Sequence, residues 1–265
     1  MKRYLMLSVL ITAVSLLLIQ GGFHSQTYDT SLLAEEGNPS LSSMLKKGII
    51  SELSTFGSQH IGTYTQWSTS CLKATGKAPE KPAVTGDKDP EEIDYEYDQV
   101  FDRWSSMYNA YSAMDGNPAT AWCEGKEDEG IGEILIVKAD ILNPVYIWNG
   151  LGKNNNLYFA NNRAKKIRLT VLQAKKASKL IGQFNIGITY NDITVLGSHD
   201  ITLKDHNGWQ PLPIPTHKRL STQSIIDNKE QIVKTEDTTF IAVEILSVYK
   251  GTKYNDTCIS EIGNN

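Results

Sequence analysis

Several glycine- and asparagine-rich stretches of this sequence carry side chains that could bind a polar ligand. Trp122 and Glu124 follow the turn-forming run Asp-Gly-Asn-Pro at 115–118, and Asn149 begins a second loop. An aromatic ring can pack on the apolar face of a sugar ring, while amides, carboxylates and guanidinium groups hydrogen-bond the sugar hydroxyls. The candidate ligand-binding residues are Trp122, Glu124, Asn149, Lys153, Tyr158, Asn161 and Arg163.

Each of these residues also has a structural interpretation. Trp122 could be a core residue that fixes the preceding turn, and the two asparagines could cap turns. Arg163 could pair with Glu124 or Glu133 and tie two loops together. The sequence leaves both interpretations open.

Asp115 and Asn117 are the candidates for a metal site. Calcium binds several oxygen ligands, and the Asp115 carboxylate, the Asn117 amide and neighbouring carbonyl groups could begin such a site. The alternative is that Asp115 only shapes the turn. Apart from this candidate calcium ion, no cofactor is expected.

The sequence contains none of the motifs that mark the common catalytic sites. It has no His-Glu-x-x-His, no Gly-x-Ser-x-Gly and no phosphate-binding Gly-x-x-x-x-Gly-Lys-Ser/Thr. The adjacent carboxylates at 127–129 cannot be placed around one scissile bond from sequence. We therefore predict a binding protein and not an enzyme, with an undetected glycan hydrolase as the weakest hypothesis.

The elements that must position these residues have the pattern of β-strands. Apolar and polar residues alternate at 167–171, 184–188 and 201–203, and 239–248 has apolar residues on both faces, as a central strand does. Three prolines confine the strand around Leu212 to a sheet edge. About eight strands separated by turns predict an all-β sandwich or jelly roll. Between 96 and 113 the pattern allows a short helix, whose many aromatic residues would pack across one end of the sandwich.

Five short motifs occur in order along the second half of the chain. They read Asp-Gly-x-x-x-Thr-Ala-Trp-x-Glu-Gly at 115–125, Gly-Ile-Gly-Glu at 130–133, Asn-Gly-x-x-Lys at 149–153, Tyr-x-x-Asn-x-Arg at 158–163 and Asp-x-x-Ile-Ser-Glu-Ile at 256–262. This pattern resembles the discoidin-like (factor V/VIII C-type, galactose-binding-like) domain that is attached to bacterial NAD glycohydrolases. The resemblance covers roughly residues 100–265.

The resemblance implies a galactose-binding-like jelly-roll β-sandwich with an irregular N-terminal extension. It also implies a non-catalytic role, because the related NAD glycohydrolases carry catalysis in a separate domain, for which we see no room beside the sandwich. The expected parts are a signal peptide at 1–25, a linker at 26–48 and a discoidin-like sandwich at 49–265. The core of the sandwich would be at about 100–265, with a charged loop inserted at 73–94.

The start of the chain resembles a secretory signal. A basic start, with Lys2 and Arg3, precedes an apolar run at 5–19. This run is shorter than the roughly 20 residues that a helix needs to cross a bilayer. We expect an exported protein, whether secreted, periplasmic or on the cell surface, with no transmembrane span in the mature chain. An uncleaved signal anchor is the alternative.

The net charge of the chain argues against nucleic acid as a partner. Removing the two positive charges of the predicted signal peptide changes the formal charge from −4 to −6. No stripe of Lys and Arg remains to neutralise phosphates, so nucleic acid is not an expected partner. The main hypothesis is a module that recognises carbohydrate on a cell or envelope surface through loops at one end of the sandwich. The alternative is a structural or adhesion protein that binds a surface protein and no sugar.

The chain has three cysteines, Cys71, Cys123 and Cys258, so at least one stays outside any internal disulfide. Export permits a disulfide. Three pairings can be drawn, and the sequence selects none of them. Cys258, in a predicted closing strand, could instead act as a small buried hydrophobic residue.

Overall fold

The computed structural model describes residues 37–58, 63–65, 67–83, 89–181, 185–218, 223–226, 229–231 and 238–264. These residues belong to one compact unit that runs from Ala34 to Asn265. The predicted signal peptide at 1–25 and the first part of the predicted linker lie outside the described residues.

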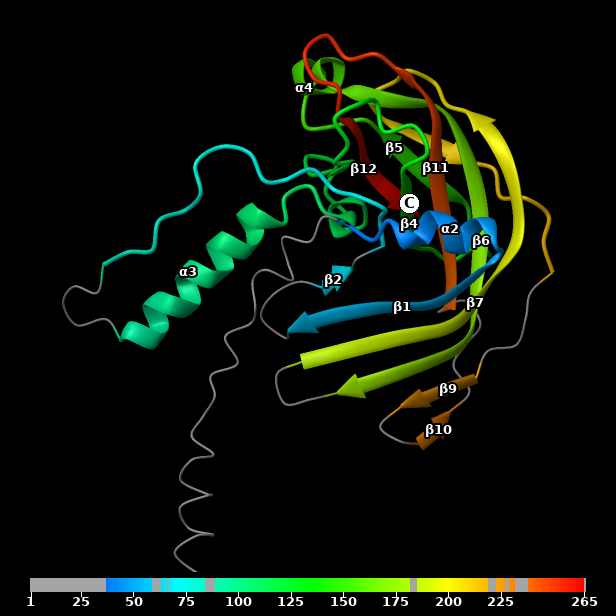
Figure 1. Ribbon diagram of the computed structural model, residues 1–265, viewed down its shortest axis with the longest axis horizontal. Coiled ribbons are helices and arrows are strands. Elements are labelled where there is room, and N and C mark those ends of the chain that lie inside the picture. Colours follow the sequence, from blue (N-terminus) through cyan, green and yellow to red (C-terminus); the bar gives the residue numbers. More distant parts are fainter. Residues whose placement is uncertain are drawn as a thin grey trace, which may run out of the picture. The chain divides into compact units, whose positions relative to one another are not determined.

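Strands make up most of the described elements (Figure 1). The strands are β1 (Ile49–Ser58), β2 (Thr63–Thr65), β3 (Trp122–Cys123), β4 (Ile134–Lys138), β5 (Val145–Asn149), β6 (Asn162–Ile181), β7 (Asn185–Thr202), β8 (Trp209–Leu212), β9 (Gln223–Ile226), β10 (Lys229–Gln231), β11 (Thr239–Tyr249) and β12 (Thr257–Gly263). The helices are α2 (Ser40–Lys46), α3 (Pro90–Ser105), the 3-10 helix η2 (Ala110–Ala113) and α4 (Asn155–Ala160). The prediction of an all-β fold is confirmed.

The strands form one curled sheet whose main path runs β2-β1-β7-β6-β12-β5-β8. β11 pairs with β6 on one side and with β4 on the other, so the central strand predicted at 239–248 is confirmed. β8 ends the path and pairs with β5, which agrees with the edge position predicted from its prolines.

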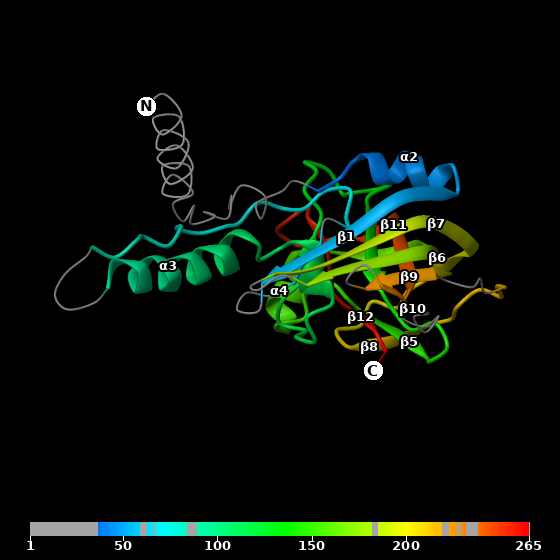
Figure 2. The ribbon, with the colours of Figure 1, turned by 90° about the horizontal axis from the view of Figure 1, so that it is seen from below.

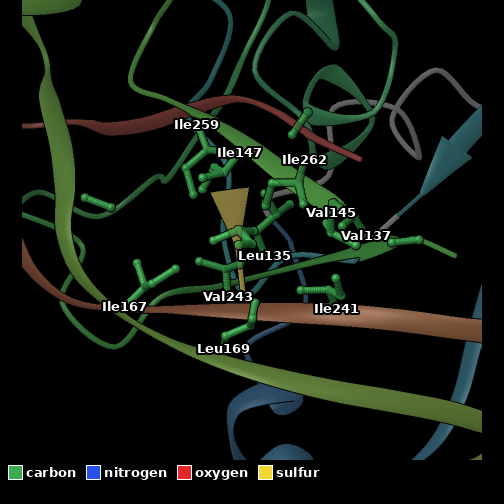
Figure 3. Close-up of a cluster of buried hydrophobic side chains, with 14 of the residues drawn as sticks. Leu135, Val137, Val145, Ile147, Ile167, Leu169, Ile241, Val243, Ile259 and Ile262 are labelled. Carbon is green, nitrogen blue, oxygen red and sulfur yellow. The ribbon is translucent and has the colours of Figure 1, made fainter. Parts of the chain in front are cut away.

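Two clusters of apolar side chains fill the curl, and β4 and β11 contribute to both. Leu135 and Val137 of β4 point into the larger cluster, whereas Ile134 and Ile136 point into the smaller one. β4 is therefore buried on both faces, and each fully buried side chain of this size contributes about 1.5–3 kcal/mol. Figure 3 shows the larger cluster, with Leu135, Val137, Val145, Ile147, Ile167, Leu169, Ile241, Val243, Ile259 and Ile262 labelled.

The smaller cluster joins the N-terminal elements to the sheet. The Trp67 ring meets Phe240 edge-on at 5.4 Å, and its Nε1 donates to the Ser54 carbonyl at 3.0 Å. Leu41 of α2 packs into the same cluster. The last part of the segment predicted as a linker at 26–48 therefore contains the helix α2, which buries an apolar side chain.

The loop predicted at 73–94 ends earlier than expected. α3 begins at Pro90, and the Asp89 side chain caps it by accepting from the Glu91 amide at 3.0 Å. The helix lies beside the segment 71–83 in both Figure 1 and Figure 2, and the Trp104 Nε1 donates to the Thr75 carbonyl at 3.1 Å. Its aromatic rings contact one another and this segment, for example Phe101 with Trp104. The prediction that they pack across one end of the sandwich is not what the structure shows.

One disulfide, between Cys123 and Cys258, joins β3 to β12. Cys71 lies outside it. The interpretation of Cys258 as a small hydrophobic residue is therefore wrong. The sequence could not select this pair, because the two cysteines are 135 positions apart and become neighbours only through the pairing of β3 with β12.

We predict that replacing both Cys123 and Cys258 by Ala lowers the free energy of unfolding by about 4 kcal/mol, because the crosslink closes a long loop in the unfolded chain. Urea denaturation of the oxidised protein measures this difference. Cys71→Ala, which leaves the disulfide in place, is the control and should lose less than half as much. Equal losses in the two proteins would contradict the prediction.

Candidate functional site

Trp122 is a core residue in this structure. Its side chain is fully buried, and its Nε1 donates to the Ser70 carbonyl at 2.9 Å. The ring therefore has no exposed face on which a sugar could stack. Of the two interpretations that the sequence left open, the geometry favours the structural one.

Glu124 is also fully buried and ties two distant segments together. One carboxyl oxygen accepts from the Thr257 amide at 3.0 Å, and the other accepts from the Lys126 amide at 2.7 Å. Burial raises the pKa of this carboxyl to about 7, and the two backbone donors offset only part of that rise. Gly130, at φ +68°, leaves room for the carboxyl group, because a Cβ there would overlap it. Glu124 of the first motif thus contacts Gly130 of the second motif and Thr257 of the fifth.

Arg163 makes the most extensive set of contacts among the candidate residues. Its guanidinium group donates two parallel hydrogen bonds to Asp205, from Nε at 3.0 Å and from Nη2 at 2.7 Å. Its Nη1 donates to the carbonyls of Asn161 at 3.0 Å and Lys250 at 2.9 Å. The prediction that Arg163 pairs with Glu124 or Glu133 is wrong. We call the Arg163–Asp205 pair and these two carbonyl bonds the Arg163 clamp.

Three loops converge on the Arg163 clamp, and we call residues 149–161, 203–208 and 250–257 the loop end. Tyr158 is fully buried and donates from its hydroxyl to Asp205 at 3.1 Å. Burial and the adjacent carboxylate of Asp205 raise the pKa of Tyr158. The Arg163 guanidinium lies over the rings of Tyr158 and Phe159, at 5.3 and 5.4 Å from their centroids. Phe159 itself is 46% exposed.

The two candidate asparagines hold the backbone of the loop end. The Asn149 side chain, fully buried, donates to the Ala164 carbonyl at 2.7 Å and accepts from the Ala164 amide at 3.0 Å. Asn161 closes α4 by donating to the Leu157 carbonyl at 2.8 Å. Lys153 is the candidate residue with an exposed side chain. The predicted residues 149–163 are therefore brought together, mostly as the framework of the loop end.

Asp115 and Asn117 form a turn that is closed by a second carboxyl group. The Asn117 amide donates both to Asp115 Oδ1 at 2.8 Å and to Glu261 Oε1 at 2.7 Å. The other Asp115 oxygen accepts from the Thr120 hydroxyl at 2.8 Å. Glu261 is only 3% exposed, and burial, together with a hydrogen bond to Asp115, raises its pKa to about 8.

This arrangement does not fit the predicted calcium site. Both Asp115 oxygens accept hydrogen bonds within the turn, and the one neighbouring carboxyl that contacts it, Glu261, accepts from the Asn117 amide. Across the described ranges, no group of three or more His, Cys, Asp or Glu side chains is placed to hold a metal ion. The turn interpretation of Asp115 is the one that the geometry favours.

An aromatic pair beside the loop end was not among the residues predicted from the sequence. Trp148 of β5 and Trp209 of β8 lie opposite each other in the sheet, with ring centroids 5.7 Å apart. The Trp148 Nε1 donates to Asn207 Oδ1 at 2.8 Å, and Asn207 donates to Asn155 Oδ1 at 2.9 Å. The sequence signal for this pair was the alternation at 145–149, where the two positions that face away from the core, Tyr146 and Trp148, are aromatic.

These observations can be compared with known proteins. The family model of the NAD glycohydrolase translocation F5/8 type C domain matches residues 100–265, which is more than half of the chain. This protein belongs to that family. No curated protein and no solved structure matches the chain.

Membership of the NAD glycohydrolase translocation F5/8 type C domain family confirms the predicted jelly-roll β-sandwich. The family is a translocation domain and not a catalytic domain. All five sequence motifs lie within the matched residues. In the part of this domain that the structure describes, no helix has the length and apolar character needed to cross a membrane.

We predict that the stability of this translocation domain falls as the pH rises from about 4.5 to about 8. The pKa of Glu261 is about 8 in the folded protein, against 4.5 for an ordinary Glu carboxyl in the unfolded chain, so the folded protein binds more protons across this window. Glu261→Gln, which keeps a donor for Asp115 and an acceptor for Asn117, should flatten the pH profile of the thermal midpoint. A weaker slope remains, because the pKa of Glu124 is raised in the same direction.

Thermal unfolding between pH 5 and pH 9 measures this effect. Glu127→Gln, at an exposed carboxylate of the neighbouring loop, is the control and should follow the wild-type profile. Parallel profiles for wild type and Glu261→Gln would show that Glu261 is ionised in the folded protein, against the prediction.

Proposed function

We propose that this protein is an exported, non-catalytic module that recognises carbohydrate on a cell or envelope surface through the loop end. The observation that carries the proposal is the Arg163 clamp, which holds three loops together at one end of the sandwich. Binding modules commonly place their ligand contacts on loops that a β-scaffold holds in place. A preorganised surface loses little conformational entropy when it binds.

The exposed groups of the loop end have the chemistry that sugars need. Phe159 and Tyr254 are 46% and 41% exposed and can pack on an apolar sugar face. Lys153 and Asn155, which are close to Phe159 in the sequence, are also exposed and can hydrogen-bond hydroxyl groups. The backbone joins these parts directly, since the Tyr254 amide donates to the Ala160 carbonyl at 2.8 Å.

In this proposal the predicted residues divide into two groups. Lys153 is a direct contact to the ligand. Arg163, Tyr158, Asn149 and Asn161 act by positioning the loops, and the buried Trp122 and Glu124 join the first motif to the rest of the sandwich.

Export is supported by two observations. The chain begins with basic residues and the apolar run at 5–19. Membership of a translocation domain family agrees with a secreted protein. An exported location would also allow the disulfide between Cys123 and Cys258 to form and persist.

A second candidate function is a structural or adhesion role in which the protein binds a surface protein and no sugar. It is favoured by α3, where Tyr95 and Val100 are 45% and 51% exposed. Apolar side chains that stay exposed on a helix are common at protein interfaces.

A glycan array, read with and without calcium, tests the proposed function. We expect the wild-type protein to bind selected glycans, and Phe159→Ala and Lys153→Ala to reduce that signal severalfold. Tyr95→Ala removes an equally exposed aromatic ring from α3 and is the matched control, which should bind as the wild type does. If the folded wild-type protein binds nothing on the array, the carbohydrate function is wrong and the protein-partner function is favoured.

A further inference from the structure

We propose that the Trp148–Trp209 pair is the floor of a binding site for a neutral hexopyranose residue, with Asn155 and Asn207 along its polar edge. This inference rests on the proposed carbohydrate function and deepens it by naming the surface and the class of sugar. None of these four residues was among the predicted site residues.

The two indole rings lie on the outer face of the sheet. Trp148 and Trp209 are paired across β5 and β8, and their chain neighbours Ile147 and Gln210 are buried on the opposite face. Since side chains alternate along a strand, both rings point away from the larger core cluster. Both residues are half-buried, which sets them apart from the fully buried Trp122.

Contacts from two loops fix the orientation of the Trp148 ring. Its Nε1 donates to Asn207 Oδ1 at 2.8 Å, and Trp209 meets the ring at an interplanar angle of 74°. On the other side, Gly152 lies so close that a Cβ there would overlap the indole nitrogen. A ring held in this way does not need to be ordered by the ligand, so little entropy is lost on binding.

The polar edge of this surface is made of amides. Asn207 donates from Nδ2 to Asn155 Oδ1 at 2.9 Å, so the two side chains form a chain of hydrogen bonds that begins at Trp148. An amide side chain offers two donors and two acceptor sites, which is more than these two hydrogen bonds use. Amide groups beside an aromatic floor match the alternation of hydroxyls and apolar C–H groups around a sugar ring.

The groups in contact with the two indoles favour a neutral sugar, while the flanking loops carry the exposed Lys153 and Lys204. Glu261 lies opposite Trp148 in the neighbouring strand β12, but it is buried under the Asp115 turn and does not present a carboxylate to this surface. The groups that hydrogen-bond around the two indoles are the amides of Asn155 and Asn207, which carry no charge. A carboxylated or sulfated sugar would gain no cation from them.

The experiment uses the full protein and neutral oligosaccharides that end in glucose, galactose or N-acetylglucosamine. The best binder from the array is titrated by calorimetry and by tryptophan fluorescence. We expect Trp209→Ala to weaken binding at least tenfold, and Trp209→Phe, which keeps an aromatic face, to weaken it less. Trp209 lies on the edge strand β8, so its loss should leave the sheet folded.

Two further variants, Asn155→Ala and Tyr95→Ala, are measured with the Trp209 variants. Asn155→Ala removes part of the polar edge and should reduce affinity severalfold, while Tyr95→Ala, on α3, should have no effect. Near-ultraviolet circular dichroism confirms that each variant keeps its fold. The fluorescence of the wild-type protein should change on titration, and that change should be reduced in Trp209→Phe.

Three results would overturn the inference, and the first two separate it from the proposed function. If glycan binding survives in Trp209→Ala at wild-type affinity but is lost in Phe159→Ala, the carbohydrate function stands and this surface is not its site. If the wild-type protein binds only acidic glycans, the class of sugar is wrong. If it binds no glycan at all, the proposed function and the inference both fail.

Discussion

The ion pair between the buried Arg163 and the more exposed Asp205 is the interaction on which the arrangement of the loops depends. The Arg163 side chain is only 5% exposed, and removing a guanidinium group from water costs several kcal/mol unless its donors are all used. Here Nε and Nη2 donate to the Asp205 carboxylate, and Nη1 donates to the carbonyls of Asn161 and Lys250, so each of the three nitrogens donates at least one hydrogen bond. Because these partners come from three separate stretches of chain, the requirement to satisfy one cation holds the three loops in a single geometry.

Buried carboxyl groups play a related role in the rest of the domain. Glu124 and Glu261 have raised pKa values, which often mark catalytic residues. Their contacts indicate a different use, because each accepts hydrogen bonds from backbone amides of another segment, Thr257 for Glu124 and Asn117 for Glu261. The motifs of this family therefore describe the framework that positions the loops. Phe159 and Lys153, to which the proposed function assigns the ligand contacts, lie between those framework residues in the sequence.

Much of the fold could be predicted from local sequence, and much of the site could not. The strand at 239–248 was predictable because a strand buried on both faces must be apolar on both faces. The start of α3 had its signal in Asp89 and Pro90, which the high charge of the segment concealed. The partner of Arg163 had no local signal, because Asp205 lies 42 positions away. Local sequence could not predict the surroundings of Trp122 and Trp148 either. Trp122 is buried against Ser70, 52 positions away, and Trp148 faces away from the core because of its position in β5.

One cation, the Arg163 guanidinium group, holds the three segments of the loop end in a single geometry. Hydrogen–deuterium exchange of Arg163→Lys, which keeps the charge but loses the planar fork, tests this most directly. We expect faster exchange in all three loops, 149–161, 203–208 and 250–257, with the amides of β4 and β11 unchanged. Arg168→Lys, in an exposed ion-pair network, is the control and should leave the loops as they are. Faster exchange confined to the residues next to Arg163, or no faster exchange at all, would show that Arg163 does not hold the three loops.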